Sequence, residues 1–506
     1  MTKAIMIQGT CSNAGKSLLA AALCRIFRED GYRVAPFKAQ NMALNSAVTP
    51  GGLEIGRAQA MQAEAAGIAP DVRMNPILLK PNSDTGSQLV LFGKPVGDYS
   101  AMEYQQKKKV LLKEVLAAYQ SLASESDIIV IEGAGSPAEI NLRADDIVNM
   151  GLAEAVDAPV ILVGDIDRGG VFAALYGTVK LLSLPEQARI KGLVINKFRG
   201  DLSILEPGLR EIQVLTGKPV LGVLPYRHFD LEDEDSLSER LQKRHPGDKA
   251  KIRIAVLRLP RLSNFTDFDA LQAAPEVALS YVTEAAELEE ADLLILPGSK
   301  NTVGDLDWLR AQGLARAIQD FQASGRPVLG ICGGYQMLGR SLRDRESGVE
   351  RAGLGLLPLE TVFEPLKQTA LMCGRITAES GFFAALRGQE TRGYEIHMGQ
   401  SRLLAGSTAF QMLCGDGTMD REAAEELRAD GCVAGNVAGT YLHGLLDEPG
   451  VLQALLQALA ARKGQDYSHL LKNRRERQEA AFQLLSETVR EHLDLRKLYR
   501  IMGVER

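Results

Sequence analysis

Aromatic residues are scarce in this sequence, where Phe, Tyr and Trp make up 5% of 506 residues and Trp occurs once. This scarcity argues against a carbohydrate or peptide groove built on stacked rings. Positive charge is not in excess either, because 58 Lys and Arg face 64 Asp and Glu, which leaves a formal net charge of −6. We therefore expect no nucleic-acid partner held by a general basic surface.

The sequence also lacks paired cysteines and long apolar runs. Its six cysteines lie far apart and form no Cys-x-x-Cys pair, so neither a zinc ribbon nor a disulfide framework is expected. No run of about 18 apolar residues occurs, which predicts no membrane span. The first residues lack the basic and apolar regions of a signal peptide. These absences predict a cytoplasmic protein with no membrane partner.

Short apolar runs alternate with amphipathic stretches, which predicts α/β architecture with parallel sheets covered on both faces. The first series of runs ends near residue 235, and a charged segment at 236–250 reads as a linker. A second series predicts another α/β domain over 251–450. The Leu-rich remainder, 451–506, predicts a helical extension that packs on this second domain.

A glycine-rich loop follows the first apolar run and precedes an apolar helical stretch. The motif GTCSNAGKS is a variant phosphate-binding loop, because five residues separate its glycines where the usual pattern has four. Backbone N–H groups of such a loop bind phosphate oxygens, and its Lys neutralises the terminal phosphates. The predicted ATP-binding residues here are Gly9, Thr10, Asn13, Gly15, Lys16 and Ser17.

Polar residues follow the other predicted strands of the first domain. Glu132 ends the run IIVIE and is the predicted Mg²⁺ ligand together with Ser17. Lys38 follows a strand-like segment, where it could face the substrate or lie in solvent. Asn196 ends another strand and is a candidate for contact with the nucleotide base.

Two further polar segments are candidates for substrate contact. Arg168 could neutralise a polyanionic substrate, and Asp167 could accept hydrogen bonds or hold a metal. Salt bridges among these residues are the simpler alternative. Asp146 could face the substrate, and a helix cap or salt bridge is an equally good interpretation.

A second chemical motif, GICGG, lies in the second predicted domain. It places Cys332 at a sharp strand-to-helix turn of the nucleophile-elbow type. The helix N-terminus that follows favours a thiolate, and the N–H of Gly333 is placed to stabilise an oxyanion. A thiol nucleophile needs a base, and the sequence offers two glycine-flanked candidates, His443 and His397.

Taken together, these motifs resemble those of the cobyric acid synthases, a family of glutamine-dependent amidotransferases of cobalamin biosynthesis. The resemblance covers nearly the whole chain. It rests on the blocks QGTCSNAGKS, FKAQNMALNS, EIGRAQAMQAEAAG, MNPILLKP, IEGAGSPAEINL, DIDRGGVFAALYG, NKFRGD, LPGSKNT, GICGGYQMLG, GYEIHMG and GTYLHGL. It implies a P-loop domain like that of dethiobiotin synthetase, followed by a class I, triad-type glutaminase domain.

The resemblance also implies roles for individual residues. Cys332 would be the glutaminase nucleophile and His443 its base, with His397 lining either the glutaminase site or the interface between the domains. Gly298 in the LPGS loop would be a second oxyanion donor. Most glutaminase domains of this class carry a Glu two residues after the His, where this chain has Leu445. Another acceptor, or none, must then orient the imidazole, and Glu395 is a candidate acceptor.

For activity, the resemblance implies amidation of the b, d, e and g carboxylates of adenosylcobyrinic acid a,c-diamide to give adenosylcobyric acid. ATP and Mg²⁺ would activate each carboxylate as an acyl phosphate, and L-glutamine would supply the ammonia. The corrinoid would be a substrate and not a prosthetic group. The order of the amidations and the oligomeric state are not predicted.

Three other interpretations are compatible with a P-loop. Cobyrinic acid a,c-diamide synthases and CTP synthetases also join a P-loop domain to a glutaminase. CTP synthetases usually have His-Pro-Glu where this chain has His-Gly-Leu. A partition-type switch ATPase with a degenerate glutaminase fold is a third, and the intact Cys332 and His443 argue against it.

Overall fold

The computed structural model describes residues 2–232, 250–404, 410–414 and 427–505. It divides into two compact units. Unit 1 comprises Met1–Ala43, Ile55–Glu234 and Gln478–Arg506, and unit 2 comprises Leu44–Glu54 and Asp235–Arg477. All but residue 250 of the predicted linker lies outside the described residues. Within those residues, no helix is both long and apolar enough to cross a membrane.

Unit 1 is built on a parallel sheet with strand order β12-β11-β10-β1-β9-β2. Its strands are continuous apolar runs because helices cover both faces, so most side chains of the central strands are buried. Strand β9, for example, is buried at all of its positions. The strands are β1 Lys3–Gly9, β2 Val34–Phe37, β9 Ile128–Glu132, β10 Val160–Asp165, β11 Ile190–Phe198 and β12 Val220–Pro225.

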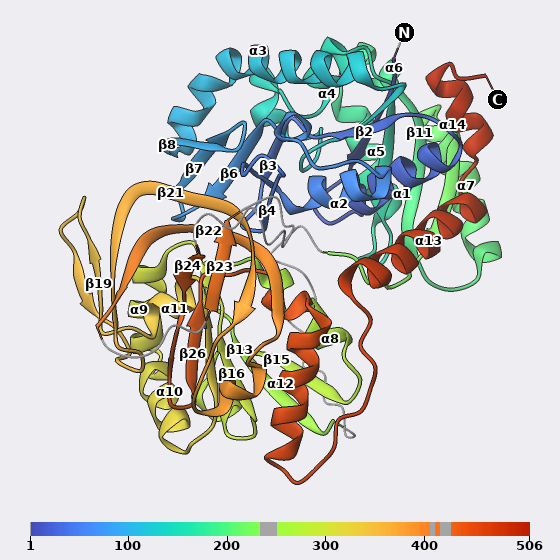
Figure 1. Ribbon diagram of the computed structural model, residues 1–506. Coiled ribbons are helices and arrows are strands. Elements are labelled where there is room, and N and C mark those ends of the chain that lie inside the picture. The colour runs from blue at the N-terminus through green and yellow to red at the C-terminus, as the bar shows by residue number, and fades with distance from the viewer. Residues whose placement is uncertain (1, 233–249, 405–409, 415–426, 506) are drawn as a thin grey trace. The chain divides into compact units, whose positions relative to one another are not determined.

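Helices and one smaller sheet complete unit 1 (Figure 1). The helices are α1 Lys16–Glu29, α2 Arg57–Ala66, α3 Ala101–Glu125, α4 Met150–Ala155, α5 Val171–Leu181, α6 Leu184–Arg189, α7 Leu202–Thr216 and α14 Leu495–Met502, with α13 Arg474–His492 from Gln478 onward. The smaller sheet has the order β3-β6-β7-β8, with β3 Gln40–Met42, β6 Ile77–Pro81, β7 Gly86–Leu91 and β8 Lys94–Ser100.

Helices α13 and α14 pack on α1, as Figure 1 shows in red and blue. Phe482 and Leu485 of α13 share one apolar cluster with the α1 side chains. Arg25 donates to Glu479 at 3.1 Å, and Arg490 donates to Asp30 at 3.1 Å. The expectation that the whole extension packs on the second domain is therefore wrong for this part, because its apolar side chains cover α1.

Unit 2 contains a mainly parallel sheet with strand order β15-β13-β16-β18-β26-β25, in which only the β25–β26 pair is antiparallel. Its strands are β13 Ile252–Leu257, β15 Val277–Val282, β16 Leu293–Leu296, β18 Val328–Ile331, β25 Cys432–Ala434 and β26 Val437–Thr440. The helices of this unit are α8 Asp269–Ala273, α9 Thr302–Ala311, α10 Leu314–Ala323, α11 Gly333–Met337 and α12 Pro449–Ala461.

A second sheet of unit 2 has the order β20-β19-β21-β23-β24, and the long strand β22 pairs antiparallel with β21. Its strands are β19 Ser341–Asp344, β20 Glu350–Ala352, β21 Leu359–Ile376, β22 Glu390–Leu403, β23 Phe410–Cys414 and β24 Leu427–Asp430. The short strands β14 Leu262–Ser263 and β17 Gly298–Ser299 form a separate antiparallel pair.

The segment Leu44–Glu54 belongs to unit 2, although the sequence around it belongs to unit 1. It contains strand β4, Ser46–Val48. The backbone N–H of Ser46 donates to Asn264 Oδ1 at 2.9 Å, and Asn45 Oδ1 accepts from the backbone N–H of Phe265 at 3.2 Å. Glu54 forms a buried ion pair with Lys367 of β21. The first 235 residues thus do not all belong to one unit.

Candidate functional site

The phosphate-binding loop connects β1 to α1. Asn13 and Gly15 both have positive φ, 59° and 97°. A Cβ atom at Gly15 would lie 2.0 Å from Asn196 Nδ2, so this position requires glycine for space as well as for conformation. Asn196 donates to the carbonyl of Ala14 at 2.9 Å. The end of β11 therefore supports the loop directly.

Lys16 is buried and extends back across the loop. Its Nζ donates to the carbonyl of Cys11 at 2.9 Å and to that of Gly135 at 3.2 Å. Gly135 lies just after β9, so the ammonium group sits between the carboxyl ends of two neighbouring parallel strands. Ligands of open α/β sheets bind at this edge.

Glu132, at the end of β9, is the centre of a buried polar cluster. Its Oε1 accepts from Ser17 Oγ at 2.8 Å and from Lys38 Nζ at 2.9 Å. Its Oε2 accepts from Gln62 Nε2 at 2.6 Å. Gln59 lies one helical turn before Gln62 on α2, and its Nε2 is 3.4 Å from the same oxygen. Lys38 is therefore neither in solvent nor at the surface.

Asp146, Asp167 and Arg168, the other substrate candidates of unit 1, lie in turns and loops outside the buried Glu132 cluster. Asp146 accepts from the backbone N–H groups of Val148, Asn149 and Gly151, in the turn that leads into α4 and in its first turn. Asp167 accepts from Arg199 at 2.8 Å. Arg168 is exposed in the loop after β10. The structure brings neither Asp167 nor Arg168 into the Glu132 cluster.

Cys332 stands between β18 and α11 with φ 51° and ψ −108°, a conformation that is strained for a non-glycine residue. Its N–H donates to the carbonyl of Thr440 at 2.8 Å, which ties the turn to β26. Its thiol lies 3.6 Å from the carbonyl of Ile396 on β22. Strain fixed in this way at a strand-to-helix turn is typical of a nucleophile elbow.

His443 is fully buried just after β26. Its Nδ1 is 2.7 Å from Asp267 Oδ2, and its ring stacks on that of Tyr394. Burial by itself lowers the pKa of His443. The charge and hydrogen bond of Asp267, together with the hydrogen bond and charge of Cys332, outweigh burial and raise that pKa to about 10. The imidazole next to Cys332 is thus a strong base.

The two glycines predicted to supply oxyanion donors lie close to these side chains. A Cβ atom at Gly333 would be 2.8 Å from the N of Ser299, so β17 runs beside the start of α11. A Cβ atom at Gly298 would be 3.3 Å from Cε1 of His443. Gly298 therefore lies beside His443, and Gly333 lies beside Ser299, the residue that follows Gly298.

His397 and Glu395 form a different cluster on β22. His397 stacks on Tyr441 with ring centroids 3.7 Å apart, and its Nε2 lies 3.5 Å from Glu395 Oε2. Glu395 also contributes, after burial, to raising the pKa of Asp430 to about 6. The expectation that Glu395 orients His443 is wrong, because Asp267 occupies the Nδ1 edge of that ring.

Sequence reasoning missed Asp267, Asn264, Gln59 and Gln62. Asp267 had one usable signal, namely an acid between two Phe residues in NFTDFD, which predicts burial and hence a partner. Gln59 and Gln62 repeat at a spacing of three within an alanine-rich helix, which places both on one face.

Comparisons with known proteins match a different domain family to each half of the chain. Residues 5–236 match the CobQ/CobB/MinD/ParA nucleotide binding domain, and residues 253–451 match the CobB/CobQ-like glutamine amidotransferase domain. A chain in the structure of PurLQS from Thermotoga maritima aligns with 20% identity and a TM-score of 0.31, covering 41% of this chain and 99% of its own.

Two curated relatives match from end to end. The cobyric acid synthase of Ruminiclostridium cellulolyticum is 52% identical, with 100% of this chain and 98% of the relative covered. The cobyric acid synthase of Photorhabdus laumondii is also 52% identical, with 100% and 99% covered. The chain is an ATP- and glutamine-dependent amidotransferase, and it belongs to the cobyric acid synthase family.

Proposed function

We propose that this chain amidates the b, d, e and g carboxylates of adenosylcobyrinic acid a,c-diamide, giving adenosylcobyric acid. ATP would transfer its γ-phosphoryl group to a carboxylate oxygen in unit 1. Ammonia from L-glutamine would then attack the acyl carbon and release phosphate. The full-length likeness to cobyric acid synthases supports this choice of substrate. A cytoplasmic location remains a prediction from the sequence.

The observation that carries the glutaminase half is the strained Cys332 beside a buried, strongly basic His443. His443 takes the proton of the thiol, and the thiolate attacks the amide carbon of glutamine. The same proton leaves with the amine, so ammonia departs and a thioester remains. Water then attacks the thioester, which releases glutamate and restores the thiol. Gly333 and Gly298 are proposed to stabilise the oxyanion of both steps.

In unit 1, we propose that the phosphate-binding loop and Lys16 hold the ATP phosphates and that Ser17 and Glu132 are the Mg²⁺ ligands. The donor set fits, because Ser17 Oγ and Glu132 Oε1 are 2.8 Å apart and both are hard oxygen ligands. Lys38 Nζ donates to the same oxygen, Glu132 Oε1, so a positive charge already lies beside this carboxylate, which supports a cation site there. Bound Mg²⁺ would neutralise charge on the phosphoryl oxygens.

The decisive experiment compares two ammonia sources in Cys332→Ala. The variant is incubated with ATP, Mg²⁺ and the corrinoid a,c-diamide, with either glutamine or a high concentration of ammonium. Mass spectrometry counts carboxyl-to-amide steps. We expect full amidation from ammonium and none from glutamine, with Cys373→Ala, another buried cysteine of unit 2, as the matched control. Loss of both activities would refute the separation of the two sites, and an unmodified corrinoid with the wild-type chain would refute the substrate.

A further inference from the structure

The loop between β14 and α8 contacts both nitrogen-bearing edges of the His443 ring. Asp267 Oδ2 lies 2.7 Å from Nδ1, and Asn264 Nδ2 lies 3.3 Å from Nε2. All three side chains are almost completely buried, with exposed fractions of 0% for His443, 2% for Asp267 and 3% for Asn264. A buried imidazole held at both nitrogens has its orientation and its proton position set by these neighbours.

Asp267 accepts a hydrogen bond from the backbone as well as from the imidazole. Its second oxygen, Oδ1, accepts from the backbone N–H of Gly444 at 3.0 Å. Both carboxylate oxygens thus hold the chain at and directly after His443. An ionised carboxylate can only accept, so the hydrogen atom between Asp267 and the ring belongs to Nδ1.

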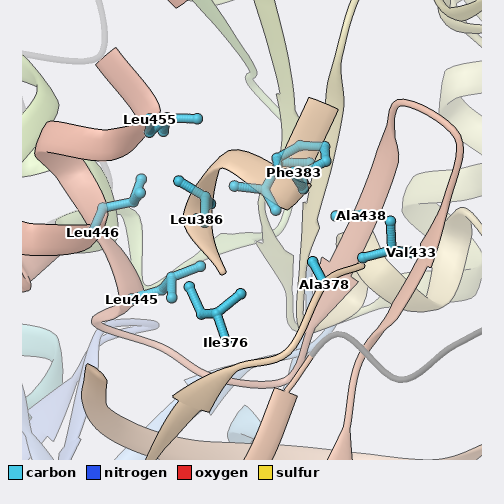
Figure 2. A pocket seen from close by; sticks show the side chains of 10 residues that line it. Ile376, Ala378, Phe383, Leu386, Val433, Ala438, Leu445, Leu446 and Leu455 are labelled. Carbon is cyan, nitrogen blue, oxygen red and sulfur yellow. The ribbon is translucent and has the colours of Figure 1, made fainter. Parts of the chain in front are cut away.

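Leu445, the position at which related glutaminases usually carry the acceptor, is buried among apolar side chains. It lines an apolar pocket with Leu446, Leu455 and Ile376 (Figure 2). A carboxylate in that pocket would be desolvated without a partner. The acceptor therefore has to come from elsewhere, and the loop before α8 supplies it.

The orientation of the Asn264 amide is determined by a residue from far away in the sequence. The backbone N–H of Ser46 donates to Asn264 Oδ1 at 2.9 Å. Only the oxygen of an amide can accept, so the NH₂ group of Asn264 is the part that faces Nε2. Asn264 has φ 52°, a left-handed conformation that Asn tolerates better than most residues. A donor at Nε2 favours the ring form in which this nitrogen carries a lone pair.

We propose that Asp267 and Asn264 are positioning residues of the glutaminase, which together hold His443 with Nδ1 protonated and Nε2 unprotonated, so that the proton of Cys332 can replace the Asn264 hydrogen bond at Nε2. This inference rests on the proposed roles of Cys332 and His443. The proton moves from Sγ of Cys332 to Nε2, the Nδ1 hydrogen stays on its bond to Asp267, and the Nε2 proton then leaves with ammonia. Ser46 contributes by fixing the direction of the Asn264 amide.

The groups that face the His443 ring predict opposite effects of two nearly isosteric substitutions. These groups are Asp267 and Asn264 from the loop, Cys332 before α11 and the Tyr394 ring from β22. Asp267→Asn removes a negative charge and lowers the pKa of His443. Asn264→Asp keeps the acceptor for Ser46 and adds a negative charge at Nε2, which raises that pKa.

The test measures glutamine-dependent kcat/KM against pH for both variants, together with ammonium-dependent amidation. We expect Asp267→Asn to lose roughly a hundredfold or more in glutamine use and to shift the acidic limb of the profile, which reports deprotonation of the base, to lower pH. We expect Asn264→Asp to lose glutamine use and to shift that limb to higher pH. Ammonium-dependent amidation should stay within about twofold of wild type in both. Asp269→Asn, two positions after Asp267, is the matched control and should behave as wild type.

Shifts in the same direction, or an Asp267→Asn variant with wild-type glutamine use, would overturn the inference. His443→Ala separates this failure from failure of the proposed function. If His443→Ala abolishes glutamine use but Asp267→Asn does not, only the positioning role is wrong. If His443→Ala retains glutamine use, the proposed base itself is wrong. Thermal unfolding followed by Trp308 fluorescence reports whether unit 2 stays folded, and a large loss of stability in Asp267→Asn without any pH shift would make its role structural.

Discussion

Asp267 Oδ2 accepts a hydrogen bond from Nδ1 of His443 at 2.7 Å, across 176 positions of the chain. A carboxylate on Nδ1 stabilises the imidazolium that forms when Nε2 takes up a proton. The negative charge of Asp267 is one of the causes that raise the pKa of His443, although complete burial of the ring alone would lower that pKa. The acceptor and the base come from different elements, so only the folded chain brings them together.

Substitution Lys16→Ala should abolish amidation from both glutamine and ammonium. Lys16 Nζ donates to the carbonyls of Cys11 and Gly135, and in the proposed function it neutralises the phosphates of ATP. Without it, the carboxylate cannot be activated, whatever the source of ammonia. Corrinoid mass spectrometry checks this, and hydrolysis of glutamine alone serves as the internal control for unit 2. Turnover with ammonium would refute the assigned role of Lys16.

His443 and His397, the two candidate bases in the sequence, should differ in their importance for glutamine use. His443→Ala removes the base and should reduce glutamine use by about a thousandfold or more. His397 stacks on Tyr441 and contacts Glu395, so His397→Ala should reduce glutamine use less. Release of glutamate from glutamine measures both. The reverse order of the two losses would mean that His397 is the base.

Helix α13 offers a matched pair for testing the packing on α1. Leu485 is 3% exposed within the apolar cluster of unit 1, whereas its neighbour Leu484 is 38% exposed. Leu485→Ala should cost about 2–5 kcal/mol in the free energy of unfolding of unit 1, from lost burial and the cavity left behind. Leu484→Ala should cost about 0.5 kcal/mol. Urea unfolding followed by circular dichroism compares them, and equal costs would contradict the packing described.

Asp305 on α9 should make the stability of unit 2 depend on pH. Burial raises its pKa to about 6 against the ordinary 3.8, although hydrogen bonds from Ser299 and Arg261 act in the opposite direction. The folded state then binds more protons than the unfolded state between these values, so stability falls as pH rises from about 4 to about 6.

Asp305→Asn removes this titration. The stability of the wild type relative to the variant should therefore drop by up to about 3 kcal/mol across that pH window. Trp308, the single Trp of the chain, lies on the same helix and reports unfolding by its fluorescence. A difference between wild type and variant that does not change with pH would show that Asp305 does not titrate there.

Those parts of the fold that depend on local pattern were predictable. The parallel strands of both units are continuous apolar runs, and the phosphate-binding loop and the GICGG turn carry their chemistry within a few residues. The sheet around β21 and β22 was not predicted. Its strands alternate buried and exposed positions irregularly, so neither period dominates in the sequence.

The rest of the site depends on contacts between distant residues, which a single sequence does not reveal. Nothing in the residues around His443 indicates that Asp267 replaces an acceptor at Leu445. Asn264 is similar, because its role follows from a hydrogen bond to Ser46 that spans 218 positions. Lys38 was expected near the substrate or in solvent, and its buried pairing with Glu132 follows from the parallel alignment of β2 and β9.

The path of the chain between the two units has a consequence for its synthesis on the ribosome. Helices α13 and α14 complete the apolar cluster around α1 and are translated only after all of unit 2. Residues Leu44–Glu54 likewise cannot form their contacts with Asn264 and Lys367 until those residues have been synthesised, more than two hundred positions later. Unit 1 therefore cannot finish folding until unit 2 has been synthesised, whereas every residue of unit 2 is made before the last helices of unit 1. The nascent chain must keep the α1 surface from aggregating until these late residues arrive.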